Sequence, residues 1–161
     1  MKPDEVPRAV LDTSVLVPDR VRRALVAAAR ADQFEGIISP HIIGELYRVL
    51  TVIGIRRARG FSPALGRQLS RDSKALMSIL LNDFELWNTE PPYDPPVTSD
   101  PDDHHLMLAA RRAQAQFVVS NDDNNYPSAD SMGLHVVDGI EFLSSNSFSL
   151  RLNERARVRG S

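Results

Sequence analysis

Hydrophobic residues along this chain follow two alternating patterns. Short apolar runs lie at residues 9–11, 36–39, 84–87, 117–120 and 135–137. A short run bounded by polar residues is typical of a strand that is buried on both faces, as in a parallel sheet. Between these runs, residues 19–31, 40–53 and 63–82 carry apolar side chains at helical spacing. Strands that alternate with helices predict an α/β fold with a central parallel sheet.

Local capping signals predict where several helices begin and end. The serine-proline pairs at 39–40 and 62–63 each place a capping hydroxyl before a proline, which favours a helix start. Gly54 is expected to end the first of these helices, and residues 100–101 to begin a later one. The segment 138–141 resembles the capping box of a last short helix.

Length and composition indicate one globular domain without disulfides. The chain has 161 residues, of which 42% are hydrophobic and 25% charged, and this suits one domain with its own core. It has no cysteine, which excludes disulfides and thiolate zinc sites and fits a reducing cytoplasm. No apolar run approaches the roughly 20 residues that span a bilayer, and the first residues lack the apolar core of a signal peptide. We therefore expect a cytoplasmic protein with a domain over residues 1–143 and a flexible tail over residues 144–161.

Four acidic residues fall where strands are predicted to end or where the following helices begin. Asp12 ends the first strand, and Glu45 lies one turn inside the helix that follows the second. Asp103 lies in the first turn of the helix after the third strand, and Asp122 follows the fourth strand by two residues. Helices that connect parallel strands start at the carboxyl edge of the sheet, so all four carboxylates are expected on one edge.

Carboxylates that gather in one cleft repel one another, and a hard divalent cation with oxygen ligands removes that penalty. The sequence therefore predicts a Mg²⁺ or Mn²⁺ centre. Such a centre can hydrolyse phosphodiester bonds, since the cation supplies hydroxide near neutral pH and stabilises charge on the phosphoryl oxygens.

Four segments of the chain together resemble the PIN domain, and in particular the bacterial toxin components of the VapC type. The segments are V-L-D-T-S-V-L-V, S-P-H-I-I-G-E-L-Y-R-V-L, D-P-D-D-H-H-L-M-L-A-A and F-V-V-S-N-D-D-N. The resemblance covers residues 8–143 and implies a three-layer α/β/α sandwich around a parallel sheet. It also implies a Mg²⁺- or Mn²⁺-dependent ribonuclease acting on RNA, a small antitoxin protein as partner, and a homodimer.

By position, Asp12, Glu45, Asp103 and Asp122 match the acidic metal-site residues of that family, and they are the catalytic and metal-binding residues that the resemblance implies. Three further residues are possible supporting groups: Ser14, Ser120 and Asn124. Ser120 matches a small hydroxyl residue that often precedes the last acid of the family. Many relatives have asparagine at the position of Ser14 and a further acid at that of Asn124. Because an amide carries no charge, the second departure weakens the case for two metal ions.

Two other functions are compatible with the same residues: a PIN-fold interaction module that has lost catalysis, and a nuclease that acts on structured DNA. Other α/β classes fit less well. A haloacid-dehalogenase-type phosphatase needs an aspartate where Ser14 stands, and a response-regulator receiver needs a late lysine, which is absent after Lys74. A dinucleotide-binding fold needs a glycine-rich turn after the first strand.

Histidines and aromatic residues near the predicted site carry less information. His104 and His105 are adjacent on a predicted helix, where side chains point about 100° apart, so they are not expected to share a metal ion. Tyr93 and Tyr126 lie in predicted loops, where they could stack on RNA bases. Trp87 is expected in the core.

Overall fold

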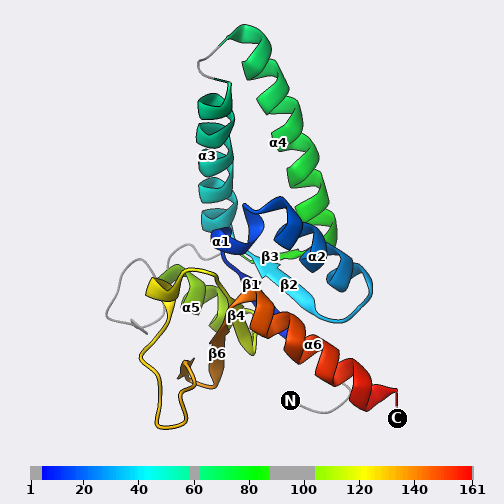
Figure 1. Cartoon of the computed structure of the whole chain (residues 1–161), viewed down its shortest axis with the longest axis vertical. Coiled ribbons are helices and arrows are strands. Elements are labelled where there is room, and N and C mark those ends of the chain that lie inside the picture. Colours follow the sequence, from blue (N-terminus) through cyan, green and yellow to red (C-terminus); the bar gives the residue numbers. More distant parts are fainter. Residues whose placement is uncertain (1–4, 59–61, 88–103, 161) are drawn as a thin grey trace.

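The computed structural model describes residues 5–58, 62–87 and 104–160 (Figure 1). Its strands are Arg8–Leu11 (β1), Glu35–Ile38 (β2), Glu85–Leu86 (β3), Phe117–Val119 (β4), Val136–Val137 (β5) and Ile140–Leu143 (β6). Its helices are Thr13–Leu16 (α1), Asp19–Arg30 (α2), Pro40–Arg57 (α3), Pro63–Asp83 (α4), His104–Arg112 (α5) and Ser145–Arg159 (α6), with a 3₁₀ turn at Asp123–Asn125 (η1).

The strands form one sheet in the order β3-β2-β1-β4-β6-β5. All neighbours are parallel except β5 and β6, which are antiparallel. After β1 the chain adds β2 and then β3 on one side of β1. It then crosses back to add β4 on the other side of β1. Right-handed crossovers then place α2 and α5 on opposite faces of the sheet, and Figure 1 shows α2 and α6 on the side away from α5. The predicted three-layer α/β/α sandwich is confirmed.

The core lies between these layers, and the predicted buried strands supply it. Val10, Ile37 and Val118 in the three central strands have no exposed surface. On the α6 side, the ring of Phe148 packs edge-on against Phe34, with 5.1 Å between ring centroids. The ring of Phe148 also packs against that of Phe117 in β4, with 5.7 Å between ring centroids. An aromatic cluster therefore joins α6 to the sheet.

The C-terminal region corrects two predictions. The segment 138–143 is not a helix: Asp138 and Gly139 both have positive φ, at 52° and 78°, and form the two-residue turn of a hairpin between β5 and β6. Such turns need two left-handed residues, for which the aspartate-glycine pair is well suited. The local pattern resembled a cap because the same residue types favour both structures.

The predicted flexible tail is also wrong for residues 145–159, because these form α6. The side chain of Ser144 caps the helix by accepting a hydrogen bond from the backbone N–H of Ser147 at 3.2 Å. Phe148 and Leu152 lie one turn apart and are both buried. Few apolar positions on an otherwise polar helix give little periodic signal, so the packing contacts decide this element.

The helices α3 and α4 form a hairpin that projects away from the sheet (Figure 1). Both begin at the predicted serine-proline pairs, and each cap serine accepts a backbone hydrogen bond. The prediction that Gly54 ends α3 is wrong, because α3 continues to Arg57. A Cβ atom at Gly54 would lie 2.5 Å from Cδ2 of Leu69 on α4. The glycine instead allows the two helices to approach closely. The helix start predicted at 100–101 lies outside the described residues.

Across the described ranges, no helix has the length and hydropathy needed to cross a membrane.

Gly36 offers a test of how tightly β2 is packed. A Cβ atom at this position would lie 2.4 Å from Cδ1 of the buried Phe84 ring. The Gly36→Ala variant should therefore lower the free energy of unfolding by about 1–3 kcal/mol, as overpacking does. Gly44 on α3 is the matched control, because nothing lies within 4 Å of its added Cβ. Gly44→Ala should keep or raise stability, by up to about 1 kcal/mol. Urea unfolding curves measure both, and equal shifts would contradict the packing explanation.

Candidate metal centre

The sheet order places a topological switch point at the carboxyl ends of β1 and β4. Chain connections leave β1 toward β2 on one side, and β4 lies on the other side. In doubly wound sheets, ligands bind where the strand order reverses in this way. Asp12 directly follows β1 and Ser120 directly follows β4. The backbone N–H of Asp12 donates to the carbonyl of Val119 at 3.0 Å, which holds the two strand ends together.

The Asp12 carboxylate is buried at this switch point, with 5% of the residue exposed. Its Oδ2 atom accepts hydrogen bonds from Ser14 Oγ at 2.7 Å, Ser120 Oγ at 2.9 Å and Asn125 Nδ2 at 3.2 Å. All three donors are neutral. Within the described part of the chain, no lysine or arginine forms an ion pair with Asp12. A buried carboxylate held only by neutral donors is a good ligand for a cation.

The two serines also fix the loop that follows β4. Ser14 Oγ accepts from the backbone N–H of Asn121 at 2.9 Å, and Ser120 Oγ accepts from that of Asp122 at 3.1 Å. These contacts tie the β4 loop to the end of β1. Both candidate supporting serines therefore contact Asp12 directly, and they also position Asp122.

Asp122 lies on this loop with an exposed side chain. Its Oδ1 atom accepts from the backbone N–H of Asn124 at 3.1 Å and so caps η1. Asn124 is exposed, and this backbone contact is how it takes part in the turn. The 3₁₀ turn brings the next residue, Asn125, back over Asp12. Asn125 was not predicted from the sequence, and the only signal was its place one turn after Asp122.

Glu45 reaches the same edge from α3. Its Oε2 atom accepts a hydrogen bond from Thr13 Oγ1 at 3.0 Å. Thr13 is buried and adjacent to Asp12 in the chain, so Glu45 lies beside the end of β1. The structure thus brings Asp12, Glu45 and Asp122 to one edge of the sheet. Asp103, the fourth predicted acid, lies outside the described residues.

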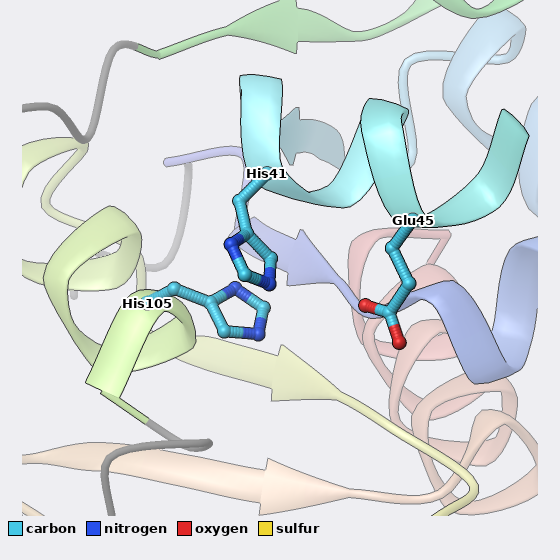
Figure 2. Close-up of side chains that lie close together, drawn as sticks. All are labelled: His41, Glu45 and His105. Atoms are coloured by element: carbon cyan, nitrogen blue, oxygen red, sulfur yellow. The ribbon is translucent and has the colours of Figure 1, made fainter. Parts of the chain in front are cut away.

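Two histidines meet beside Glu45, as Figure 2 shows. The imidazole rings of His41 on α3 and His105 on α5 stack with 3.9 Å between centroids. Burial lowers the pKa of His105 to about 4. The neighbouring His41 and His104 also lower this pKa, and Asp12 raises it. The sequence did not predict His41 as a site residue. Its helix was predicted, but the local pattern does not show that α5 lies opposite α3 and brings His105 to it.

The lowered pKa of His105 predicts an acid-sensitive contribution to stability. In the unfolded chain a histidine titrates near its ordinary value of about 6.5, whereas in the folded protein the pKa is about 4. The folded state therefore disfavours the charged form of His105. Its contribution to the free energy of unfolding is fully present above pH 6.5 and is lost as the pH falls toward 4. NMR titration of the metal-free protein should show His105 titrating near pH 4. A His105 pKa at or above 6.5 would contradict the buried environment.

Two aromatic residues at this edge of the sheet, Tyr126 and Trp87, serve the fold. Tyr126 donates its hydroxyl to the carbonyl of Ser120 at 2.8 Å, and burial raises the pKa of this phenol to about 12, with Asp123 adding to the shift. Trp87 packs partly buried against the core, as predicted. Tyr93 lies outside the described residues. Tyr126 is thus held as a support of the β4 loop, whereas the sequence left it open to base stacking.

The chain is thus a doubly wound α/β domain with carboxylates at its switch point, which is the arrangement that the sequence predicted. The sequence model of one family, the PIN domain, matches residues 8–124. The chain therefore belongs to the PIN domain family. PIN domains are a nuclease fold, and their nucleases generally use divalent metals. No curated protein matches the chain.

Proposed function

We propose that this protein is an endoribonuclease that uses Mg²⁺ or Mn²⁺ to hydrolyse phosphodiester bonds in RNA. The observation that carries the proposal is the Asp12 carboxylate, which is buried, held by neutral donors and followed in the chain by Thr13, which donates to Glu45. Oxygen ligands of this kind suit hard divalent cations. The family resemblance supports RNA as the substrate.

In this proposal, Asp12, Asp103 and Asp122 hold the cation, and Glu45 binds it or positions the attacking water. The bound cation supplies a water of lowered pKa and stabilises charge on the phosphoryl and leaving oxygens. Ser14, Ser120 and Asn125 keep the Asp12 carboxylate in one orientation, and Thr13 does the same for Glu45. In-line attack by water should leave a 5′-phosphate and a 3′-hydroxyl.

The resemblance to toxin components supports a narrower form of the proposal. In that form the protein is the toxin of a toxin–antitoxin pair, acts in the cytoplasm as a homodimer, and is neutralised by a small antitoxin. If the gene beside this one encodes a small protein, that protein should bind the chain and stop RNA cleavage. Binding without inhibition would argue against the toxin role while leaving the nuclease intact.

The central experiment compares cleavage of a single-stranded RNA, a structured RNA and matched DNA oligonucleotides with Mn²⁺, with Mg²⁺ and with EDTA. We expect metal-dependent cleavage of RNA with 5′-phosphate products. Preferential cleavage of structured DNA would favour the alternative nuclease. Asn124, which brings no charge where relatives have an acid, is the one feature that favours a non-catalytic module. That function predicts no cleavage of any substrate and no specific Mn²⁺ uptake by calorimetry.

Asn125 provides a test of the orienting contacts. Its Nδ2 atom donates to Asp12 Oδ2 at 3.2 Å and to Ser120 Oγ at 3.3 Å. Asn125→Ala removes both bonds without removing a proposed ligand, and loss of such an outer contact lowers metal affinity or activity by about 10- to 100-fold. Cleavage rates measured over a range of Mg²⁺ concentrations should show this loss. Asn146→Ala on the exposed first turn of α6 is the control and should be unchanged. Identical kinetics for Asn125→Ala would exclude an orienting role.

A further inference from the structure

Three side chains from two helices converge next to the acidic edge. His41 and Glu45 lie one helical turn apart on α3 and so share a face of that helix. His105 comes from α5. One ligand atom from each residue, an imidazole nitrogen or a carboxylate oxygen, lies within 4.8 Å of the other two. Figure 2 shows the two rings face to face, with the Glu45 carboxylate extending toward the same space.

The nuclease proposal leaves one feature of this cluster unexplained. Nδ1 of His105 is buried and has no hydrogen-bond partner among the described residues. A buried polar atom without a partner is costly and calls for an explanation, of which an absent ion is one. His41, in contrast, is exposed, so its ring is free of the core packing that would fix its rotamer.

We infer that His41, Glu45 and His105 form a second cation site, which binds Zn²⁺ in preference to Mg²⁺. Two histidines with one glutamate is a ligand set that holds zinc and leaves a fourth position for water. Imidazole nitrogen suits zinc and related transition metals, whereas Mg²⁺ takes oxygen ligands. Metal–ligand bonds of about 2.0–2.2 Å require the three ligand atoms to lie roughly 3–3.5 Å apart. An imidazole binds a metal ion through a lone pair in the plane of its ring, so the exposed His41 side chain must rotate out of its stack on His105 for both nitrogens to reach one ion.

Glu45 connects this site to the acidic edge. It is a member of the proposed Mg²⁺ or Mn²⁺ ligand set and also the one carboxylate of the histidine cluster. An ion in the histidine cluster would therefore draw Glu45 away from the acidic set. It follows that Zn²⁺ should inhibit Mg²⁺-dependent cleavage, a consequence that rests on the proposed nuclease function. The binding of Zn²⁺ does not depend on that function.

The test titrates Zn²⁺ into the full-length protein by calorimetry in a large excess of Mg²⁺, which keeps the acidic edge occupied. Wild type should bind one Zn²⁺, and His41→Ala should weaken that affinity by about 10-fold or more. His104→Ala is the matched control, because it removes an adjacent histidine that is not in the cluster, and it should bind as wild type does. Co²⁺ used as a spectroscopic probe should give visible absorption bands in wild type and lose them in His41→Ala.

A third variant separates the two sites. Asp12→Asn weakens Mg²⁺ at the acidic edge and removes no ligand of the histidine cluster, so in excess Mg²⁺ its Zn²⁺ affinity should equal or exceed that of wild type, whether or not the protein proves to be a nuclease. Zn²⁺ binding that is lost in Asp12→Asn but kept in His41→Ala would place the ion at the acidic edge and overturn the inference. No Zn²⁺ binding by wild type would overturn it as well. Where wild type cleaves RNA, His41→Ala should retain cleavage with Mg²⁺ and resist inhibition by Zn²⁺.

Discussion

Replacing Asp12 with asparagine is expected to abolish most Mg²⁺-dependent RNA cleavage while the protein still folds. The variant removes the buried negative charge that is proposed to hold the cation. Since changing an outer contact of a metal site already costs about 10- to 100-fold, loss of a direct ligand should lower the rate by about 100-fold or more. An asparagine carbonyl oxygen can still accept from the serines and Asn125, so the local hydrogen bonds have a replacement acceptor.

The control for this variant is Asp32→Asn. Asp32 is exposed in the turn before β2, which lies at the opposite edge of the sheet, and its φ of 54° is one that asparagine tolerates. Its cleavage rate should equal that of wild type. Circular dichroism and thermal unfolding of both variants in EDTA establish that they fold. Equal cleavage by Asp12→Asn and wild type would remove Asp12 from the mechanism.

Truncation of Phe148 should cause the largest loss of stability among single changes in α6. The ring has no exposed surface and contacts both Phe34 and Phe117. Phe148→Ala leaves a cavity at this junction of α6 with the sheet, for which buried phenylalanines typically lose about 3–5 kcal/mol. Denaturant unfolding followed by circular dichroism gives the difference directly.

Leu150 on the same helix is the matched control, because it is 63% exposed. Leu150→Ala should change the free energy of unfolding by no more than about 0.5 kcal/mol. A loss for Phe148→Ala as small as that of the control would mean that α6 does not pack on the sheet in solution. The flexible tail predicted from the sequence would then be right.

The helix starts show how far local chemistry determines this fold. Each serine-proline pair places an acceptor and a fixed backbone angle within a few residues of each other, and both pairs begin a helix as predicted. At Gly54 the same reasoning failed, because a glycine within a helix also serves close packing against a neighbour. A glycine that ends a helix and a glycine inside a helix look alike in the local sequence. Only the position of Leu69 shows that Gly54 is of the second kind.

The acidic edge was predictable for a topological reason. In a parallel sheet every connecting helix begins at the same edge, so residues just after strands, such as Asp12 and Asp122, come together from far apart in the chain. Contacts that depend on which helices face each other were not predictable. The His41–His105 stack joins α3 to α5, and Asn125 reaches Asp12 only because η1 turns back.

The sequence by itself determined the alternation of strands and helices, the α/β class and the edge that carries the acids. These follow from hydrophobic periodicity and from the geometry of parallel connections, which act over a few residues or over whole elements. The tertiary structure alone decided that residues 145–159 are a packed helix, that 138–143 turn into a hairpin, and that two histidines meet beside Glu45. The packed helix and the histidine pair depend on contacts between distant segments, and the hairpin is fixed by the pairing of β6 with the distant β4. A local pattern does not contain the energies of such contacts.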